Sequence, residues 1–156
     1  MGLLRRIYGT RAGQLAPDLR REVEAEGVVL LRERVRGTVT YRHYRRPGMR
    51  TQLQKVGMTW ALALTERRLL LDGPPHLGLD LPWAEAAFLE VAADDDRVCL
   101  AVSDAARLHP RTSGRVELRV RTDDPAGLVA TIAALRGRAA AATATAVPPP
   151  APPPPA

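Results

Sequence analysis

Residues 60–73 read Trp-Ala-Leu-Ala-Leu-Thr-Glu-Arg-Arg-Leu-Leu-Leu-Asp-Gly and indicate the fold more clearly than any other stretch of the chain. Two short apolar runs flank a polar connector at 65–68, and Asp72-Gly73-Pro74-Pro75 ends the second run. Neither run is long enough for a stable isolated helix, whereas two paired strands joined by a tight turn fit the pattern. The stretch therefore predicts a small β-rich domain, and it carries no signature of a chemical activity.

Length and composition are those of a single domain. Of the 156 residues, about 120–135 remain for one core once the Pro-rich end is set aside, which is an ordinary domain size. The apolar share of 46% allows folding without metal or disulfide staples. Cys99 is the single cysteine, which excludes an internal disulfide and a cysteine-based zinc cluster. Its apolar surroundings in the sequence predict a small buried core residue.

The beginning of the chain predicts no secretory signal, because charged residues appear at Arg5 and Arg6 before any apolar stretch of sufficient length. No run approaches the length of a membrane-spanning helix. We therefore expect a cytoplasmic protein that can also lie peripherally at the inner face of the membrane.

The region before residue 60 predicts two further strands joined by a turn. Apolar and polar residues alternate over 35–43, the period of a half-buried strand, and 52–64 is the next strand. Gly37 interrupts the first of these and marks either a tight reversal or a bulge. Arg45-Arg46-Pro47-Gly48 has the composition of a turn.

The remaining strands are short and separated by turn residues. We predict them at 68–71, 77–81, 87–92, 97–102 and 116–121, with a hairpin turn at Asp94-Asp95-Asp96.

Two helices frame these strands. Pro17–Glu26 is the first, with Gly27 as its C-cap and Leu19 and Val23 as a narrow apolar stripe. The second begins at Asp124-Pro125 and ends at Gly137. Its predicted apolar face is Leu128, Ile132 and Leu135. We divide the chain into an N-terminal extension with a short helix (1–26), the folded domain (27–138) and a disordered Ala/Pro-rich tail (139–156).

This order of elements, together with three short motifs, resembles bacterial pleckstrin-homology-like (PH-like) and GRAM-like domains. The residues that carry the resemblance are 62–71, which are similar to an L-T-x-R-R-L strand-turn-strand, 81–83 and 113–118. The resemblance implies an α+β, mainly β fold: a partly open β-barrel of about seven antiparallel strands, capped by a C-terminal α-helix and preceded by a short N-terminal helix. It also implies a module that binds lipids or proteins and is not an enzyme.

Positive charge is concentrated in the first half of the predicted sheet. Residues 28–68 hold ten Lys and Arg against two acids, a net of +8, whereas the rest of the chain holds 13 against 15, and the whole carries +6. Guanidinium groups bind phosphate through paired donors, so this region is a candidate site for anionic lipid headgroups. The candidate residues are Arg42, Arg45, Arg46, Arg50 and Lys55.

Three other interpretations remain open for this basic region. It could be a solvated strand face in an arginine-rich protein, or it could meet an acidic protein partner. A separate hypothesis is a protein-interaction module that binds through an uncovered sheet edge or the apolar stripe of the N-terminal helix, without a lipid role. Nonspecific nucleic-acid binding is a weaker alternative, because few aromatic residues are available for stacking.

The inventory of reactive residues predicts no enzyme, metal or cofactor. His43, His76 and His109 do not have the spacing of metal ligands, and neither Ser103 nor Ser113 lies in a nucleophile motif. No glycine pattern of a phosphate-binding loop occurs. The sequence leaves the ligand and the oligomeric state open.

Overall fold

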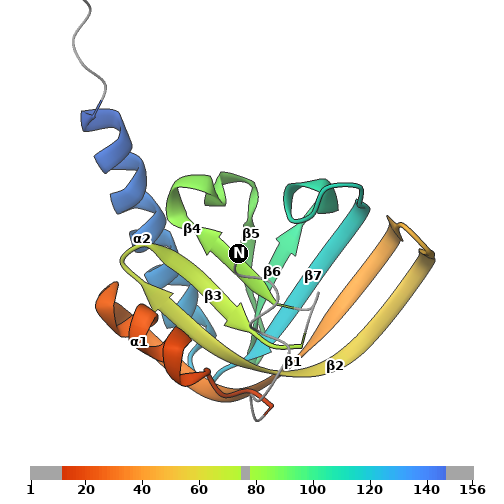
Figure 1. The fold of residues 1–156 in the computed structure, drawn as a ribbon, viewed down its shortest axis with the longest axis horizontal. Helices are drawn as coiled ribbons and strands as arrows, with labels where there is room; N and C mark the ends of the chain where they lie inside the picture. Colours follow the sequence, from red (N-terminus) through yellow and green to blue (C-terminus); the bar gives the residue numbers. More distant parts are fainter. Residues whose placement is uncertain (1–11, 75–77, 147–156) are drawn as a thin grey trace, which may run out of the picture.

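The computed structural model describes residues 12–74 and 78–146, and within them the chain forms one seven-stranded antiparallel sheet with two α-helices (Figure 1). The sheet has the order β4-β3-β2-β1-β7-β6-β5. Its strands are β1 (Val28–Arg46), β2 (Met49–Thr65), β3 (Arg68–Asp72), β4 (Leu79–Pro82), β5 (Glu90–Asp94), β6 (Arg97–Val102) and β7 (Ser113–Arg121). The helices are α1 (Pro17–Ala25), α2 (Pro125–Thr145) and the 3-10 turns η2 (Trp83–Phe88) and η3 (Ala105–Arg107).

The hairpin predicted from residues 60–73 is confirmed, because the end of β2 pairs with β3 in antiparallel register. The Thr65 hydroxyl closes the turn by accepting the backbone N–H groups of Arg67 at 3.1 Å and Arg68 at 3.0 Å. Trp83 then donates its indole N–H to the Thr65 carbonyl at 2.8 Å. The threonine therefore fixes both the reversal and the position of the tryptophan that follows β4.

The other predicted strands are also present, with shifted ends. The turn at Asp94-Asp95-Asp96 joins β5 to β6, and the period-two segment 116–121 lies in β7. Residues 87 and 88, predicted as the start of a strand, belong to η2 instead.

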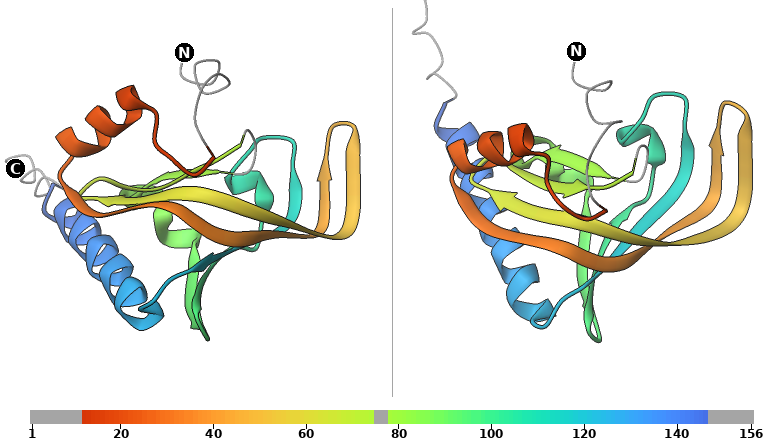
Figure 2. Two further views of the ribbon diagram at one scale, coloured as in Figure 1. Left: turned by 90° about the horizontal axis from the view of Figure 1, so that it is seen from below. Right: turned by 60° about the horizontal axis from the view of Figure 1, so that its bottom comes forward.

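The sheet curls into a half-barrel whose concave side holds the main core (Figure 2). Alternate residues of the strands face this side, among them Val39, Trp60, Leu100 and Leu118, each 2% exposed or less. Burying a side chain of this size stabilises the fold by about 1.5–3 kcal/mol. One face of α2 joins the same cluster through Leu128, Ile132 and Leu135, as the sequence predicted.

Gly37 marks neither a reversal nor a bulge, contrary to both sequence interpretations. β1 runs through it without interruption, and it pairs with Met58 and Val120. A Cβ atom there would lie 2.0 Å from the Arg119 carbonyl oxygen and 2.5 Å from the Trp60 ring. The glycine is required because the backbone passes this close to its neighbours.

The irregular positions of β1 lie elsewhere. Arg34 and His43 have positive φ angles of 56° and 48°. Register shifts fall between Arg32 and Val35 against β2, and between Arg42 and Arg45 against β7. These shifts bend and twist β1 without ending it.

The start of α2 is confirmed and its end is not. Asp124 accepts the N–H of Gly127 at 2.9 Å, which is the predicted N-cap. The helix does not stop at Gly137 but continues to Thr145, so residues 139–145 are helical and the expected tail from 139 is corrected there. Alanine has the highest helix propensity, which sustains this extension although most of its residues are exposed. The Pro-rich segment 147–156 lies outside the described residues.

Helix α1 covers the convex side of the sheet at β2 and β3. Leu19 and Val23 are buried there against Ala61, Ala63 and Leu70, in a second core cluster. The small alanine side chains let the helix approach the strands. The apolar stripe of α1 is thus occupied by the protein's own sheet, which corrects the hypothesis that it offers a free binding surface.

Candidate functional site: the basic arm of the first hairpin

The predicted site residues lie on the far half of the β1–β2 hairpin, which we call the arm and define as residues 42–56. β2 pairs with β3 only from Ala61 onward, so the arm reaches well beyond the β3–β4 side of the sheet (Figures 1 and 2). On its other side β1 stays paired with β7 as far as Arg45 and Ser113. Pro47-Gly48 forms the tip, and the φ of Gly48 is 77°. The arm is therefore held to the sheet along one strand only.

Four of the five predicted residues form an unneutralised group on the arm. Arg45 and Arg50 are paired directly across the two strands, Arg46 follows at the tip, and Lys55 lies further along β2 opposite Thr40. Arg45, Arg50 and Lys55 are exposed and Arg46 is half-buried. Among the described residues, none of the four forms an ion pair with a carboxylate. Like charges directly opposite one another destabilise a β-ladder. An added anion that binds both arginines would therefore relieve their repulsion.

Arg42, the fifth predicted residue, does not belong to this free group. Its Nε donates to Glu117 Oε1 at 3.3 Å on the neighbouring strand β7. The partner is 75 residues away in the sequence, which is why charge counting could not find it.

Leu53 is a feature of the arm that charge analysis missed. Its side chain is 62% exposed, the highest value among the exposed large apolar residues of the described chain. It lies opposite Arg42 and two positions from Lys55. An exposed leucine among cations is the combination found where a protein meets the interface of a membrane. The alternation of β2 could have suggested it, since Leu53 has the same parity as Lys55.

The arginines of β7 contrast with those of the arm because each has acidic partners on the outer face of the sheet. Arg115 binds Glu117 at 2.9 Å and Glu90 at 2.9 Å. Arg119 binds Asp94 at 2.9 Å. Arg121 binds Asp96 at 2.7 Å. We call this set the outer-face network.

Glu117 is the centre of the outer-face network. Its side chain is 10% exposed, and its Oε2 is buried without a hydrogen bond, 3.7 Å from Arg119 Nη2. Burial alone would raise the pKa of Glu117, but the hydrogen bond from Arg115 and the charge of Arg42 outweigh it and lower that pKa. The carboxylates in turn raise the pKa of Arg115, chiefly through its hydrogen bonds to Glu90 and Glu117. This face is therefore internally compensated.

Along the arm, only Arg42 has such compensation among the described residues. Residues 34–65 contain seven Lys and Arg and not one Asp or Glu. His43 also lies on the arm, and its Nδ1 is 2.7 Å from Gln52 Oε1. Apart from Arg42, the arm thus presents positive charge that no outer-face acid neutralises.

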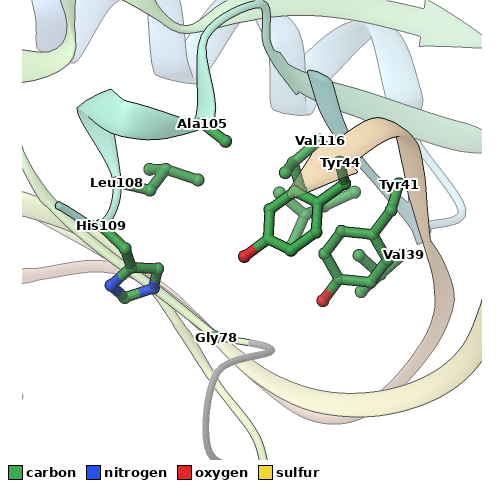
Figure 3. Close-up of a pocket in the computed structure, with 9 residues that line it drawn as sticks. Val39, Tyr41, Tyr44, Gly78, Ala105, Leu108, His109 and Val116 are labelled. Carbon is green, nitrogen blue, oxygen red and sulfur yellow. The ribbon is translucent and has the colours of Figure 1, made fainter. Parts of the chain in front are cut away.

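The cavity on the concave side of the sheet, at the base of the arm, is too small for a ligand. A cavity of about 20 Å³ lies between the rings of Tyr41 and Tyr44, whose centroids are 4.8 Å apart, and the side chains of Leu108 and His109 (Figure 3). Burial, with the charge of Tyr44 adding to it, raises the pKa of Tyr41. A space of this size holds about one water molecule. Binding by the arm must therefore take place on its surface.

The other chemical groups of the described residues give no second site. No cluster of three or more His, Cys, Asp or Glu with the geometry of a metal site occurs in the described part of the chain. Cys99 is half-buried on the outer face beside Arg119, not a core residue as predicted. Burial raises the pKa of its thiol, so it is not activated as a nucleophile. Within the described ranges, no helix is long and apolar enough to cross a membrane.

Comparisons with known proteins leave the chain without a family. No family model matches the sequence. No curated protein matches it either. Among solved structures, a chain of the 8S snRNP assembly intermediate is similar over 74% of this chain and 83% of that chain, with 10% identity and a TM-score of 0.39. Neither fold nor function is assigned from similarity at this level.

Proposed function

We propose that this chain is a non-catalytic, PH-like binding module that attaches peripherally to anionic phospholipid surfaces through the arm. The observation that carries the proposal is the contrast in pairing: the arm's cations at 45, 46, 50 and 55 have no acidic partner among the described residues, whereas the arginines of β7 are neutralised. Free cations are the ones that an anionic surface attracts.

The interaction energies expected for the arm at an anionic membrane are large enough for reversible binding. Each basic residue close to an anionic membrane contributes about 1 kcal/mol. Leu53 adds an apolar contact where the membrane interface excludes water. Four cations and one leucine on a projecting hairpin therefore supply reversible attachment, which suits an adaptor.

Vesicle co-sedimentation tests the proposal. The full chain should bind vesicles of phosphatidylcholine mixed with phosphatidylglycerol and not vesicles of phosphatidylcholine alone. The triple variant Arg45→Glu, Arg46→Glu and Arg50→Glu should bind the anionic vesicles about a hundredfold more weakly, because three favourable contacts are lost.

The matched control makes the same change in charge on α1, in the β2–β3 turn and on α2. Arg21, Arg67 and Arg138 are exposed and lie away from the arm. Reversing these three should weaken vesicle binding only slightly. Equal losses for the two triples, or no binding of anionic vesicles at low salt, would refute the proposal.

The same preparation distinguishes the nucleic-acid alternative. Binding to duplex DNA that falls steeply with salt, without any response to lipid, would replace the membrane proposal with nonspecific nucleic-acid binding.

A further inference from the structure

The arm has an open edge that the membrane proposal does not use. β2 pairs with β1 along its whole length, but its opposite side meets β3 only over Ala61–Leu64. From Met49 to Thr59 no strand of the described residues lies on that side. An unpaired edge of this length exposes backbone N–H and C=O groups that can pair with another extended chain.

The direction of these backbone groups follows from the alternation of an antiparallel ladder. Both groups of a residue point to the same neighbour, and successive residues alternate. Glu66 N–H donates to Gly27 O on the β1 side, and the Thr65 carbonyl accepts from Trp83 on the opposite side. Counting back along β2, the odd-numbered residues from Leu53 to Thr59 direct their groups to the open edge.

The side chains beside this edge favour one kind of occupant. Arg50 and Lys55 project from β2 itself, Arg45 lies directly across from Arg50, and residues 34–65 hold no acid. The half-buried Val56 and Met58, two positions apart, offer apolar contacts on one face of β2, and the exposed Leu53 offers one on the other face. An incoming strand that places carboxylates beside the cations satisfies both the backbone and the charge.

We propose that the open edge of β2 binds an extended acidic peptide segment of a partner protein as an added β-strand. In this mode the main chain supplies affinity and the alternate side chains supply specificity. A second copy of this chain is a poorer occupant, because antiparallel pairing of two β2 edges would bring two acid-free arms, with seven cations in each 34–65 segment, against each other.

Two synthetic peptides of equal charge test strand addition. The first is a nine-residue peptide alternating Glu with Val and Thr, and the second has the same number of Glu with two central prolines. Prolines remove backbone donors and cannot extend the ladder. Fluorescence anisotropy with the full chain should show at least about tenfold weaker binding of the proline peptide, the loss expected for a few broken hydrogen bonds. Equal affinities, or no binding of the first peptide, would overturn the proposal.

A pair of variants at Gly57 tests the same edge from the side of the protein. A Cβ atom at this position meets nothing within 4 Å, so Gly57→Ala is a control with room for its side chain. Gly57→Pro also removes an N–H that points to the open edge, and edge strands tolerate proline in this orientation. We expect Gly57→Pro to weaken peptide binding about tenfold and Gly57→Ala to leave it unchanged.

The outcomes separate this proposal from the membrane proposal. Gly57→Pro retains every cation, so its vesicle binding should equal that of the wild type. If Gly57→Pro proves unfolded by circular dichroism, the comparison of the two peptides decides the question alone. Sedimentation showing a dimer that Gly57→Pro abolishes would assign the edge to a second copy and overturn the acidic-peptide proposal.

Discussion

The outer face of β7 and the arm of the β1–β2 hairpin use the same residue type in opposite ways. On β7 the guanidinium of Arg115 binds two carboxylates, Glu90 and Glu117, whereas Arg50 on the arm faces another arginine, Arg45. The first arrangement joins β5, β6 and β7 across the sheet. The second leaves positive charge without compensation. An arginine therefore indicates an anion-binding site only where no carboxylate of the same protein already pairs with it.

The largest expected effect concerns Gly37, where β1 first pairs with β7 at the border of the two regions. Gly37→Ala should lower the free energy of unfolding by about 3 kcal/mol or more, because its Cβ would lie 2.0 Å from the Arg119 carbonyl oxygen. Urea denaturation measures the change. Gly57→Ala, on β2 next to the arm, is the matched control and should be neutral or stabilising by about 0.5 kcal/mol. Similar losses at both glycines would contradict the difference in packing.

The second effect tests the centre of the outer-face network. Glu117→Gln should lower the free energy of unfolding by about 2 kcal/mol, since a largely buried carboxylate that compensates three arginines is lost. The loss in the free energy of unfolding is moderate because the arginines are partly exposed and can be hydrated in the variant. Glu66→Gln, which breaks an exposed pair with Arg138, should change it by no more than about 0.5 kcal/mol. A neutral Glu117→Gln would show that the network contributes no stability.

The third effect is a pH dependence. The pKa of Glu117 is lowered in the folded protein, so its contribution to stability is present above the unfolded value of about 4.3 and is lost as the pH falls through the folded pKa. Wild type should therefore lose more stability than Glu117→Gln when the pH is lowered from neutral to below that range. Thermal unfolding followed by circular dichroism at a series of pH values gives both curves. Parallel curves for the two proteins would contradict the assignment.

The smallest effect concerns the arm itself. Arg50→Ala should raise the free energy of unfolding by about 0.3 kcal/mol at low ionic strength, because it removes the like charge opposite Arg45. Added salt should erase this gain by screening the pair. Arg115→Ala in the outer-face network should instead destabilise the protein. Destabilisation by Arg50→Ala would reveal an anionic partner for the arm within the protein.

Local patterns predicted much of the fold because their causes are local. The apolar runs at 60–73, the alternation at 116–121 and the Asp124 N-cap each specify a structure through neighbours in the sequence, and each is confirmed. The end of α2 was predicted wrongly, because Gly137 is only a weak helix breaker beside a run of alanines. Gly37 was misread because its neighbours, Trp60 and Arg119, are distant in the sequence.

The sequence predicted most of the residues of the candidate site but not which of them are paired within the protein. The sequence located the cations of the arm, and four of the five predicted residues share its surface. It could not show that Arg42 is paired with Glu117, that the sheet covers the apolar stripe of α1, or that β2 keeps an open edge. Each of these depends on which strands and helices become neighbours.

By itself the amino-acid sequence determined a β-rich domain with an acid-free basic hairpin, because periodicity, turn residues and charge are properties of adjacent positions. Only the tertiary structure decided which charges are neutralised and which backbone groups are left unpaired. Both depend on contacts between residues tens of positions apart, and these contacts form only when the sheet curls and the helices cover it.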